Sequence, residues 1–177
     1  MKKPAKKTAL VTTPEPGRQY AALPYRDRDG LQVLLLTSRE TRRWIIPKGW
    51  PMVGKTPYAA AAREALQEAG VVGRVSKRPV GEFHYIKRLR NGAPLQCAVD
   101  VFPLKVVKQR THWREQGERT VHWFTPAEAA ELVEEPELSE LILGFVDTYA
   151  RAVARKRAKA TKTVTASEIE AETPDEG

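Results

Sequence analysis

The 177-residue sequence has a single cysteine, Cys97, and no apolar run near the length of a membrane-spanning helix. One cysteine excludes an internal disulfide and a metal site built from several thiolates. A bilayer crossing needs about 18 consecutive apolar residues. The N-terminal lysines (MKKPAKKTAL) are followed by polar sequence, unlike the apolar centre of a signal peptide. These absences predict a cytoplasmic protein with no membrane partner, in which Cys97 packs in the core.

Aromatic residues make up only 7% of the chain, whereas the formal net charge is +8. Such a charge is compatible with nucleic acid, an anionic membrane surface or a phosphate-rich small molecule as partner. The sequence shows none of the basic-and-aromatic signatures of an RNA-binding module. A polyphosphorylated small molecule is therefore the better-matched partner, and nucleic acid stays an alternative only as a 5′-phosphorylated RNA end. Nothing in the sequence indicates the oligomeric state.

The chain is long enough for one domain with loose ends. Residues 1–16 are rich in proline, lysine and threonine, which predicts a disordered basic arm. Residues 17–150 are expected to form the folded domain. Residues 151–177 are expected to form a helical extension followed by a charged, disordered tail.

Apolar runs of strand length alternate with turn signals over most of the chain. Asp29-Gly30 and Asn91-Gly92 are both typical of tight hairpin turns. Residues 48–55 contain two glycines and a proline and are expected to form a loop. The expected strands are residues 18–26, 31–39, 43–47, 71–75, 79–89, 95–107 and 119–124.

Three segments have helical character. Residues 57–69 are rich in alanine, with Thr56 as the expected N-terminal cap and Gly70 as a left-handed terminator. Residues 125–133 and 136–158 form two more expected helices. Strands that enclose one helix and are followed by two others predict an α/β sandwich, with a mixed sheet and helices on both faces.

The helix over residues 57–69 carries a polar ridge. Glu64, Gln67 and Glu68 fall within an arc of about 100°. Their oxygens are hard ligands of the kind that Mg²⁺ or Mn²⁺ prefers. The alternative is an acidic helix face that meets only solvent, and spacing alone does not separate the two interpretations.

The segment from residue 49 to residue 71 resembles the Nudix box, G-x5-E-x7-R-E-U-x-E-E-x-G-U, where U is apolar. Two specified positions depart from the pattern, because Lys55 and Gln67 stand where it has glutamate. The positions that agree are Gly49, Arg63, Glu64, Ala65, Glu68, Gly70 and Val71.

The likeness extends over residues 18–145. LLTSRETRRWIIPKGWP and EQGERTVHWFTPAEAAELV resemble the branch of the family that hydrolyses diphosphoinositol polyphosphates and diadenosine polyphosphates. The resemblance implies an α/β/α sandwich with a mixed sheet. It also implies a hydrolase that uses Mg²⁺ or Mn²⁺ to cleave a phosphoanhydride bond in a diphosphoinositol polyphosphate or a dinucleoside polyphosphate.

The resemblance also assigns roles to the box residues. It makes Glu64 and Glu68 the principal metal ligands and adds the backbone carbonyl of Gly49. Arg63 is expected to orient these carboxylates by a salt bridge, and Gln67 retains one neutral oxygen for the metal. Removing the negative charge at residue 67 should weaken cation binding.

Residues outside the box are expected to complete the site. The general base is sought in the loop HWREQGER, which offers Glu115 and Glu118, and Glu118 is preferred because it lies nearer the following strand. The alternative for each of these glutamates is a surface residue with no catalytic role. Basic and hydroxyl side chains before the box are expected to bind substrate phosphates: Arg18, Ser38, Arg39, Arg43 and Lys48.

Other aromatic side chains and the two departures from the pattern leave alternatives. Trp50, His84 and Tyr85 are either pocket or packing residues. Lys55 is either a phosphate contact or a solvated charge. Because of Lys55 and Gln67, the alternative function is a catalytically weakened Nudix module that binds or senses a nucleotide or polyphosphate.

Overall fold

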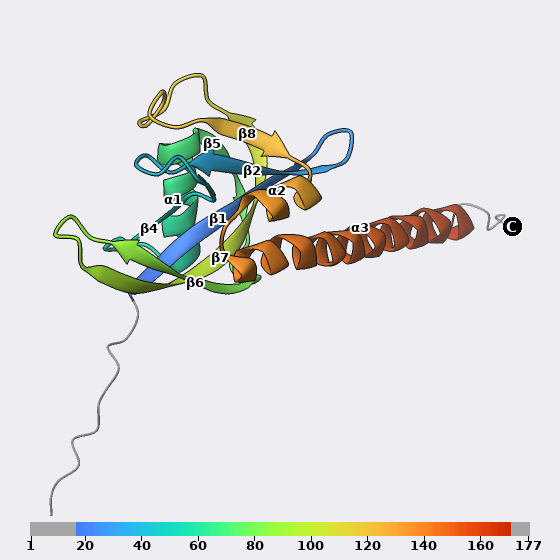
Figure 1. Cartoon of the computed structure of the whole chain (residues 1–177). Coiled ribbons are helices and arrows are strands. Elements are labelled where there is room, and N and C mark those ends of the chain that lie inside the picture. The colour runs from blue at the N-terminus through green and yellow to red at the C-terminus, as the bar shows by residue number, and fades with distance from the viewer. Residues whose placement is uncertain (1–16, 171–177) are drawn as a thin grey trace, which may run out of the picture.

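The computed structural model describes the backbone of residues 17–170 (Figure 1). The expected arm over residues 1–16 and the end of the expected tail, residues 171–177, lie outside the described residues. The strands are β1 (Gly17–Asp27), β2 (Leu31–Thr37), β3 (Trp44–Ile45), β4 (Lys48–Gly49), β5 (Val71–Val75), β6 (Gly81–Arg88), β7 (Pro94–Gln109) and β8 (Val121–Phe124). The helices are α1 (Pro57–Ala69), α2 (Pro126–Leu132) and α3 (Pro136–Glu170).

One mixed sheet organises the fold. Its central path runs β3-β2-β1-β7-β5, while β4 pairs with β1, β6 with β7 and β8 with β2. The long strands β1 and β7 are parallel, and their neighbours are antiparallel. This arrangement confirms the mixed sheet. Both expected hairpins are present, β1–β2 at Asp29-Gly30 and β6–β7 at Asn91-Gly92.

The segment over residues 48–55 was expected to be entirely loop, and that expectation was wrong for its first two residues. Lys48 and Gly49 form β4, which is antiparallel to β1 with Gly49 opposite Tyr20. Sequence patterning missed this strand because two residues are too short to show alternation. The pairing fixes the backbone of β4 against the centre of the sheet.

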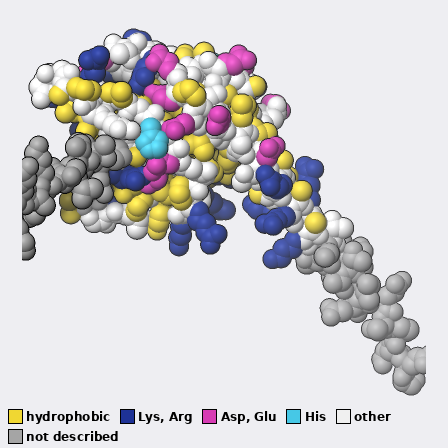
Figure 2. Space-filling model, turned by 60° about the horizontal axis from the view of Figure 1, so that its bottom comes forward, with side chains coloured by type: hydrophobic (Ala, Val, Ile, Leu, Met, Phe, Trp, Pro, Cys, Tyr) yellow, Lys and Arg dark blue, Asp and Glu magenta, His cyan; other side chains and the backbone are white. Residues whose placement is uncertain are grey.

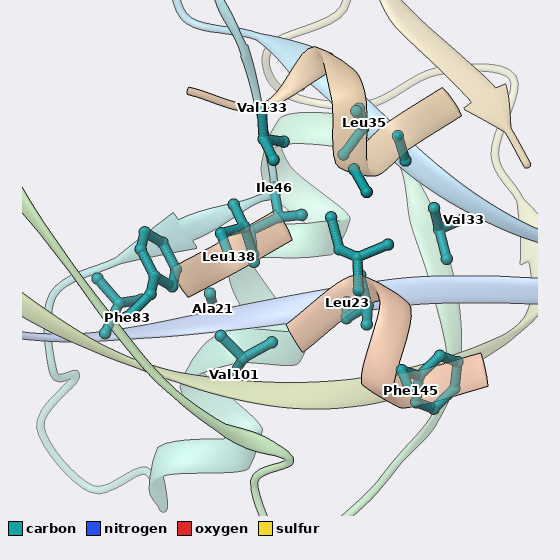
Figure 3. Close-up of a cluster of buried hydrophobic side chains, with 14 residues drawn as sticks. Ala21, Leu23, Val33, Leu35, Ile46, Phe83, Val101, Val133, Leu138 and Phe145 are labelled. Atoms are coloured by element: carbon teal, nitrogen blue, oxygen red, sulfur yellow. The ribbon is translucent and has the colours of Figure 1, made fainter. Parts of the chain in front are cut away.

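Helices cover both faces of the sheet, as the sandwich prediction requires (Figure 1). Side chains alternate along β1 and β2, so that Leu23 and Leu35 face one side while Ala22 and Leu34 face the other. The first side packs against α2 and α3, and Figure 3 shows Leu138 and other α3 side chains lying over these strands. The second side packs against α1 through its alanines. Cys97 is fully buried, which confirms its expected place in the core.

The C-terminus of α1 is closed by the segment that leaves β7. Helices end with free backbone carbonyls that need partners. Here the donors are the Gln109 side-chain amide, the Arg110 and Glu115 backbone N–H groups and the Trp113 indole N–H. Gln109 donates to the carbonyl oxygen of Ala69, Arg110 to that of Gly70, Glu115 to that of Gln67 and Trp113 to that of Glu68. The loop between β7 and β8 is thereby attached to the helix that carries the Nudix-like box.

Gly70 occupies the position at which α1 ends and this loop crosses it. Its φ is +70°, and a Cβ placed there would lie 2.6 Å from the Trp113 ring. We expect Gly70→Ala to reduce the free energy of unfolding by about 2–4 kcal/mol, because the left-handed backbone cost adds to the overpacking cost. Urea denaturation measures this change.

Gly92→Ala is a matched control for that measurement, since Gly92 has φ +80° and no atom within 4 Å of an added Cβ. It should show the backbone cost alone, about 1–2 kcal/mol. Equal losses for the two variants would show that Trp113 does not pack on Gly70 as described.

Helix α3 runs to Glu170, beyond the expected end at residue 158. Its C-terminal half projects from the sheet (Figure 1), and Figure 2 shows basic side chains gathered on the part of the helix nearer the sheet. No helix among residues 17–170 is both long and apolar enough to cross a membrane. The division of the chain at residues 16 and 150 remains a prediction.

Candidate functional site

The structure brings Glu64 and Glu68 of α1 against β4. The backbone N–H of Lys48 donates to Glu68 Oε2 at 3.1 Å, and the Glu68 side chain is only 8% exposed. A Cβ added at Gly49 would overlap the carboxylate of Glu64. Gly49 therefore permits a close approach of backbone and carboxylate that any larger residue would block. Three residues singled out in the sequence meet at one place.

Arg119 is the buried partner of this acidic pair, and sequence reasoning missed it. Its Nη2 lies 2.6 Å from Glu68 Oε1, its Nε donates to Glu115 at 2.8 Å, and its Nη1 donates to the Thr37 carbonyl at 3.1 Å. The Arg119 side chain is 6% exposed. A charged residue in the loop just before β8 carries no local signal of burial, because its partner Glu68 lies 51 positions away.

Burial of Glu64 and Glu68 disfavours their ionised forms. Burial raises the pKa of Glu68 to about 7, although Arg119 and the charge of Lys48 act in the opposite direction. Burial also raises the pKa of Glu64, and the nearby carboxylate of Glu115 adds to that effect. Among the described residues, none donates a hydrogen bond or ion pair to the Glu64 carboxylate. An added cation would stabilise both ionised carboxylates.

The donor set fits a divalent cation. Glu64 and Glu68 supply carboxylate oxygens, and the backbone of Gly49 adjoins them. Over the part of the chain described here, no group of three or more histidine, cysteine, aspartate and glutamate side chains is placed to hold a metal. Water would therefore have to complete the coordination, as is usual for Mg²⁺.

Two other residues of the Nudix-like box, Arg63 and Gln67, form no side-chain hydrogen bond with Gly49 or the paired glutamates in the described part of the chain. The Gln67 side chain borders a surface hollow together with Trp113. Arg63 is exposed and, within residues 17–161, makes no ion pair with either box glutamate. Arg63 was expected to form a salt bridge with the box carboxylates, and in the structure Arg119 forms one with Glu68.

The loop between β7 and β8 brings one of its two glutamates to the box. The Glu115 carboxylate is 16% exposed, is held by Arg119, and lies close enough to raise the pKa of Glu64. Glu118 is 48% exposed and pairs with Arg39 at 3.2 Å. The geometry thus places Glu115 nearer the site than Glu118, which the sequence favoured.

Lys48 and Arg43 converge on Tyr85 of β6. Lys48 Nζ lies 5.0 Å from the Tyr85 ring centroid and the Arg43 guanidinium lies 5.9 Å from it. Burial lowers the pKa of Lys48 to about 8, and the charge of Glu68 acts against this. Glu135 lies 3.2 Å from Arg43, and its second carboxylate oxygen has no hydrogen-bond partner among the described residues. This is a basic cluster beside β4, on the side of the sheet that α3 covers.

The remaining expected phosphate contacts lie elsewhere or are engaged. Arg18 pairs with Glu82 and, at 3.3 Å, with Asp100. The hydroxyl of Ser38 is hydrogen-bonded to that of Thr41 at 2.6 Å. Arg39 is tied to Glu118, as described above. Of the five residues, Arg43 and Lys48 alone are brought together around one aromatic ring.

Trp50 and His84 are both surface residues rather than core residues. Trp50 is 40% exposed, with Lys87 Nζ 5.0 Å from its ring centroid. His84 is hydrogen-bonded to Glu137 and lies 3.2 Å from Glu82. Neither residue lies against the paired glutamates of α1.

The fold is an α/β/α sandwich, in which a mixed sheet lies between helices. Its acidic site is on one helix, where two glutamates lie against β4. The NUDIX domain family model matches residues 16–145, and the chain belongs to this family. The family resemblance seen in the sequence is thus confirmed. Nudix hydrolases generally use divalent metals.

Relatives and solved structures support the family and the fold. Nudix hydrolase 12, mitochondrial, of Arabidopsis thaliana is 32% identical over 105 residues, covering 58% of this chain and 52% of its own length. Diphosphoinositol polyphosphate phosphohydrolase 3-beta of Bos taurus is 39% identical over 67 residues, covering 37% of this chain and 40% of its own. The chain spans about half the length of the first of these relatives. The Ap4A hydrolase binary complex of C. elegans superposes with a TM-score of 0.57 at 20% identity, covering 75% of this chain and 97% of that one.

Proposed function

We propose that this chain is a Nudix pyrophosphohydrolase that uses Mg²⁺ or Mn²⁺ to cleave a phosphoanhydride bond in a polyphosphorylated small molecule. The observation that carries the proposal is the meeting of Glu64, Glu68 and Gly49 beside a buried arginine. The names of the bovine relative and of the C. elegans neighbour point to a diphosphoinositol polyphosphate or a dinucleoside polyphosphate as substrate. The basic cluster of Arg43 and Lys48 suits such an anion.

Each residue has a part in the proposed reaction. The cation that Glu64 and Glu68 hold would neutralise the diphosphate and lower the pKa of an attacking water. Arg119 fixes the Glu68 and Glu115 carboxylates relative to each other. We assign the role of general base, which accepts the proton of that water, to the Glu115 carboxylate, because Arg119 links it to Glu68. Lys48 and Arg43 bind phosphate oxygens of the substrate.

A weakened binding module is the second candidate function. It is favoured by Gln67 and Lys55, which remove two negative charges from the family pattern. It is also favoured by Arg119, which already occupies one oxygen of Glu68. Such a module would bind a nucleotide or polyphosphate without turning it over.

A panel of diphosphate compounds separates the two functions. The panel contains a diphosphoinositol polyphosphate, a diadenosine polyphosphate, a nucleoside diphosphate sugar and a 5′-triphosphate RNA, each with Mg²⁺ or Mn²⁺. We expect phosphate release from at least one of the first two, and a loss of about a hundred-fold or more in Glu68→Gln, because a metal ligand loses its charge.

Glu131→Gln is the control for the panel, since Glu131 is exposed on α2, and it should retain full activity. Ligand binding with no turnover of any compound would support the sensing module instead. Turnover that survives Glu68→Gln would remove the metal role from this carboxylate.

The compartment and the partners belong to the same proposal. We place the enzyme in the cytoplasm with a soluble anionic substrate, although the Arabidopsis relative carries a mitochondrial name. Fractionation of cells that express the whole chain tests this placement. Recovery with mitochondria would contradict it.

A further inference from the structure

A hollow of about 210 Å³ lies on the side of α1 that faces away from the sheet. Its lining includes Arg63, Gln67, Arg110, His112, Trp113 and Arg114. The alanines of α1 that pack on the sheet, such as Ala65, point to the opposite side of the helix. The hollow is therefore bordered by the outer face of α1 and by the loop that leaves β7.

The arginines of this hollow form no ion pairs within the described range, although the charges of Arg63 and Arg114 act on the nearby Glu64 carboxylate and oppose the rise that burial causes in its pKa. Arg63, Arg110 and Arg114 are exposed, and none of them makes an ion pair with another residue in the described range 17–161. By contrast, Arg39 and Arg43 are each paired with glutamates. Three unpaired guanidinium groups around one cavity favour the binding of an anion with several oxygens.

The loop arginines are held on a fixed backbone. The Arg110 N–H donates to the Gly70 carbonyl at 2.8 Å, and the Trp113 indole donates to the Glu68 carbonyl at 3.2 Å. The Glu115 N–H donates to the Gln67 carbonyl at 3.1 Å. These bonds flank Arg114 on both sides, so a ligand would not have to order this segment on binding.

The two departures from the Nudix box border two hollows that meet at Arg63. A second hollow of about 250 Å³ is lined by Lys55, Arg63 and Leu66 among others, and it shares Arg63 and Leu66 with the first. The box pattern has glutamate where this chain has Lys55 and Gln67. A glutamate at position 67 would lie one helical turn from Arg63 and oppose its charge, whereas the amide of Gln67 does not.

The hollow also adjoins the acidic site. Arg63 directly precedes Glu64 in α1, and Arg114 directly precedes Glu115, which Arg119 links to Glu68. A polyphosphate chain bound near Glu64 could therefore extend around the helix towards Gln67.

We propose that Arg63, Arg110 and Arg114 form a second anion site around Gln67, which takes a phosphate group of a polyphosphate. Its role during turnover rests on the proposed function, whereas its affinity for an anion does not. Gln67 is then a specificity residue, because its neutral amide leaves the three arginines free for the ligand.

Calorimetric titration of inorganic tripolyphosphate into the whole chain tests the site. The buffer contains EDTA and has low ionic strength, so that no divalent cation contributes and screening is weak. We expect binding by the unmodified chain. Arg114→Gln, Arg110→Gln and Gln67→Glu should each weaken it about ten-fold, since each removes a charge-assisted contact or supplies a competing carboxylate.

Arg28→Gln is the matched control, because Arg28 is an exposed arginine in the β1–β2 turn. It should change the affinity less than two-fold, and circular dichroism should show that every variant is folded. Absence of binding, unchanged affinity in Gln67→Glu, or an equal loss in Arg28→Gln would each overturn the proposal. A chain that fails the diphosphate panel but passes this titration would lose only the hydrolase assignment, so the two failures are distinguishable.

Discussion

Replacement of Glu64 by glutamine is expected to reduce kcat about a thousand-fold or more. Glu64 makes no hydrogen bond or ion pair with another described side chain, and it lies against Gly49 with burial raising its pKa. In our account the cation is its partner, and loss of that cation removes several kcal/mol of transition-state stabilisation. Phosphate release with the substrate found in the panel measures the effect.

The same variant should not lose stability in metal-free buffer. Because an ionised, half-buried carboxylate without a partner is unfavourable, Glu64→Gln should leave the midpoint of thermal unfolding unchanged or raise it. Mn²⁺ should stabilise the unmodified chain and have a smaller effect on the variant. Full activity in Glu64→Gln, or a large loss of stability without metal, would contradict the role given to Glu64.

Replacement of Arg119 by methionine should cause the largest loss of stability, about 3–5 kcal/mol. The substitution removes the buried cation between Glu68 and Glu115 and leaves both carboxylates unpaired. It also removes the donor to the Thr37 carbonyl, which lies in the sheet. Urea denaturation in the presence of EDTA measures the change in the free energy of unfolding.

Mn²⁺ should restore part of that loss, because a cation at Glu64 and Glu68 takes over some of the charge that Arg119 supplied. Arg42→Met is the matched control, since Arg42 is exposed and contacts the same loop at the Glu118 carbonyl and the Thr120 hydroxyl. That substitution should cost less than about 0.5 kcal/mol. If Arg119→Met costs no more than Arg42→Met, the buried charge network does not exist as described.

The predictable part of the fold rests on local signals. Helix α1 could be predicted to the residue because alanine-rich sequence runs from Pro57 to Gly70, whose φ is +70°. Thr125 forms the capping box of α2 with Glu128. Thr56 stands at the start of α1 as expected but makes no side-chain capping bond. Local sequence signals therefore predicted the first residues of these helices, but they did not predict which capping hydrogen bonds form.

The candidate site is less predictable because its residues meet through long-range packing. The family pattern singled out Gly49, Glu64 and Glu68, and β4 then brought them together. No pattern singled out Arg119, which contacts α1 only because the loop after β7 is anchored to the helix C-terminus. The same anchoring explains why Glu115, rather than Glu118, lies near the box.

The phosphate contacts show a similar limit. The sequence offered five polar residues by their position before the box, and charge alone did not distinguish them. In the structure Lys48 and Arg43 share Tyr85, and Arg43 is also paired with Glu134 and Glu135, whereas Arg18 lies elsewhere, paired with Glu82 and Asp100. Acidic partners from β6 and β7 could be found only once the strands were placed.

The anomalous signal of crystals soaked in Mn²⁺ with a non-hydrolysable pyrophosphate analogue tests the central claim most directly. We predict a peak about 2.0–2.3 Å from carboxylate oxygens of both Glu64 and Glu68 and next to Gly49. No peak beside these side chains, with Arg119 still bound to Glu68, would contradict a metal-dependent reaction at this helix.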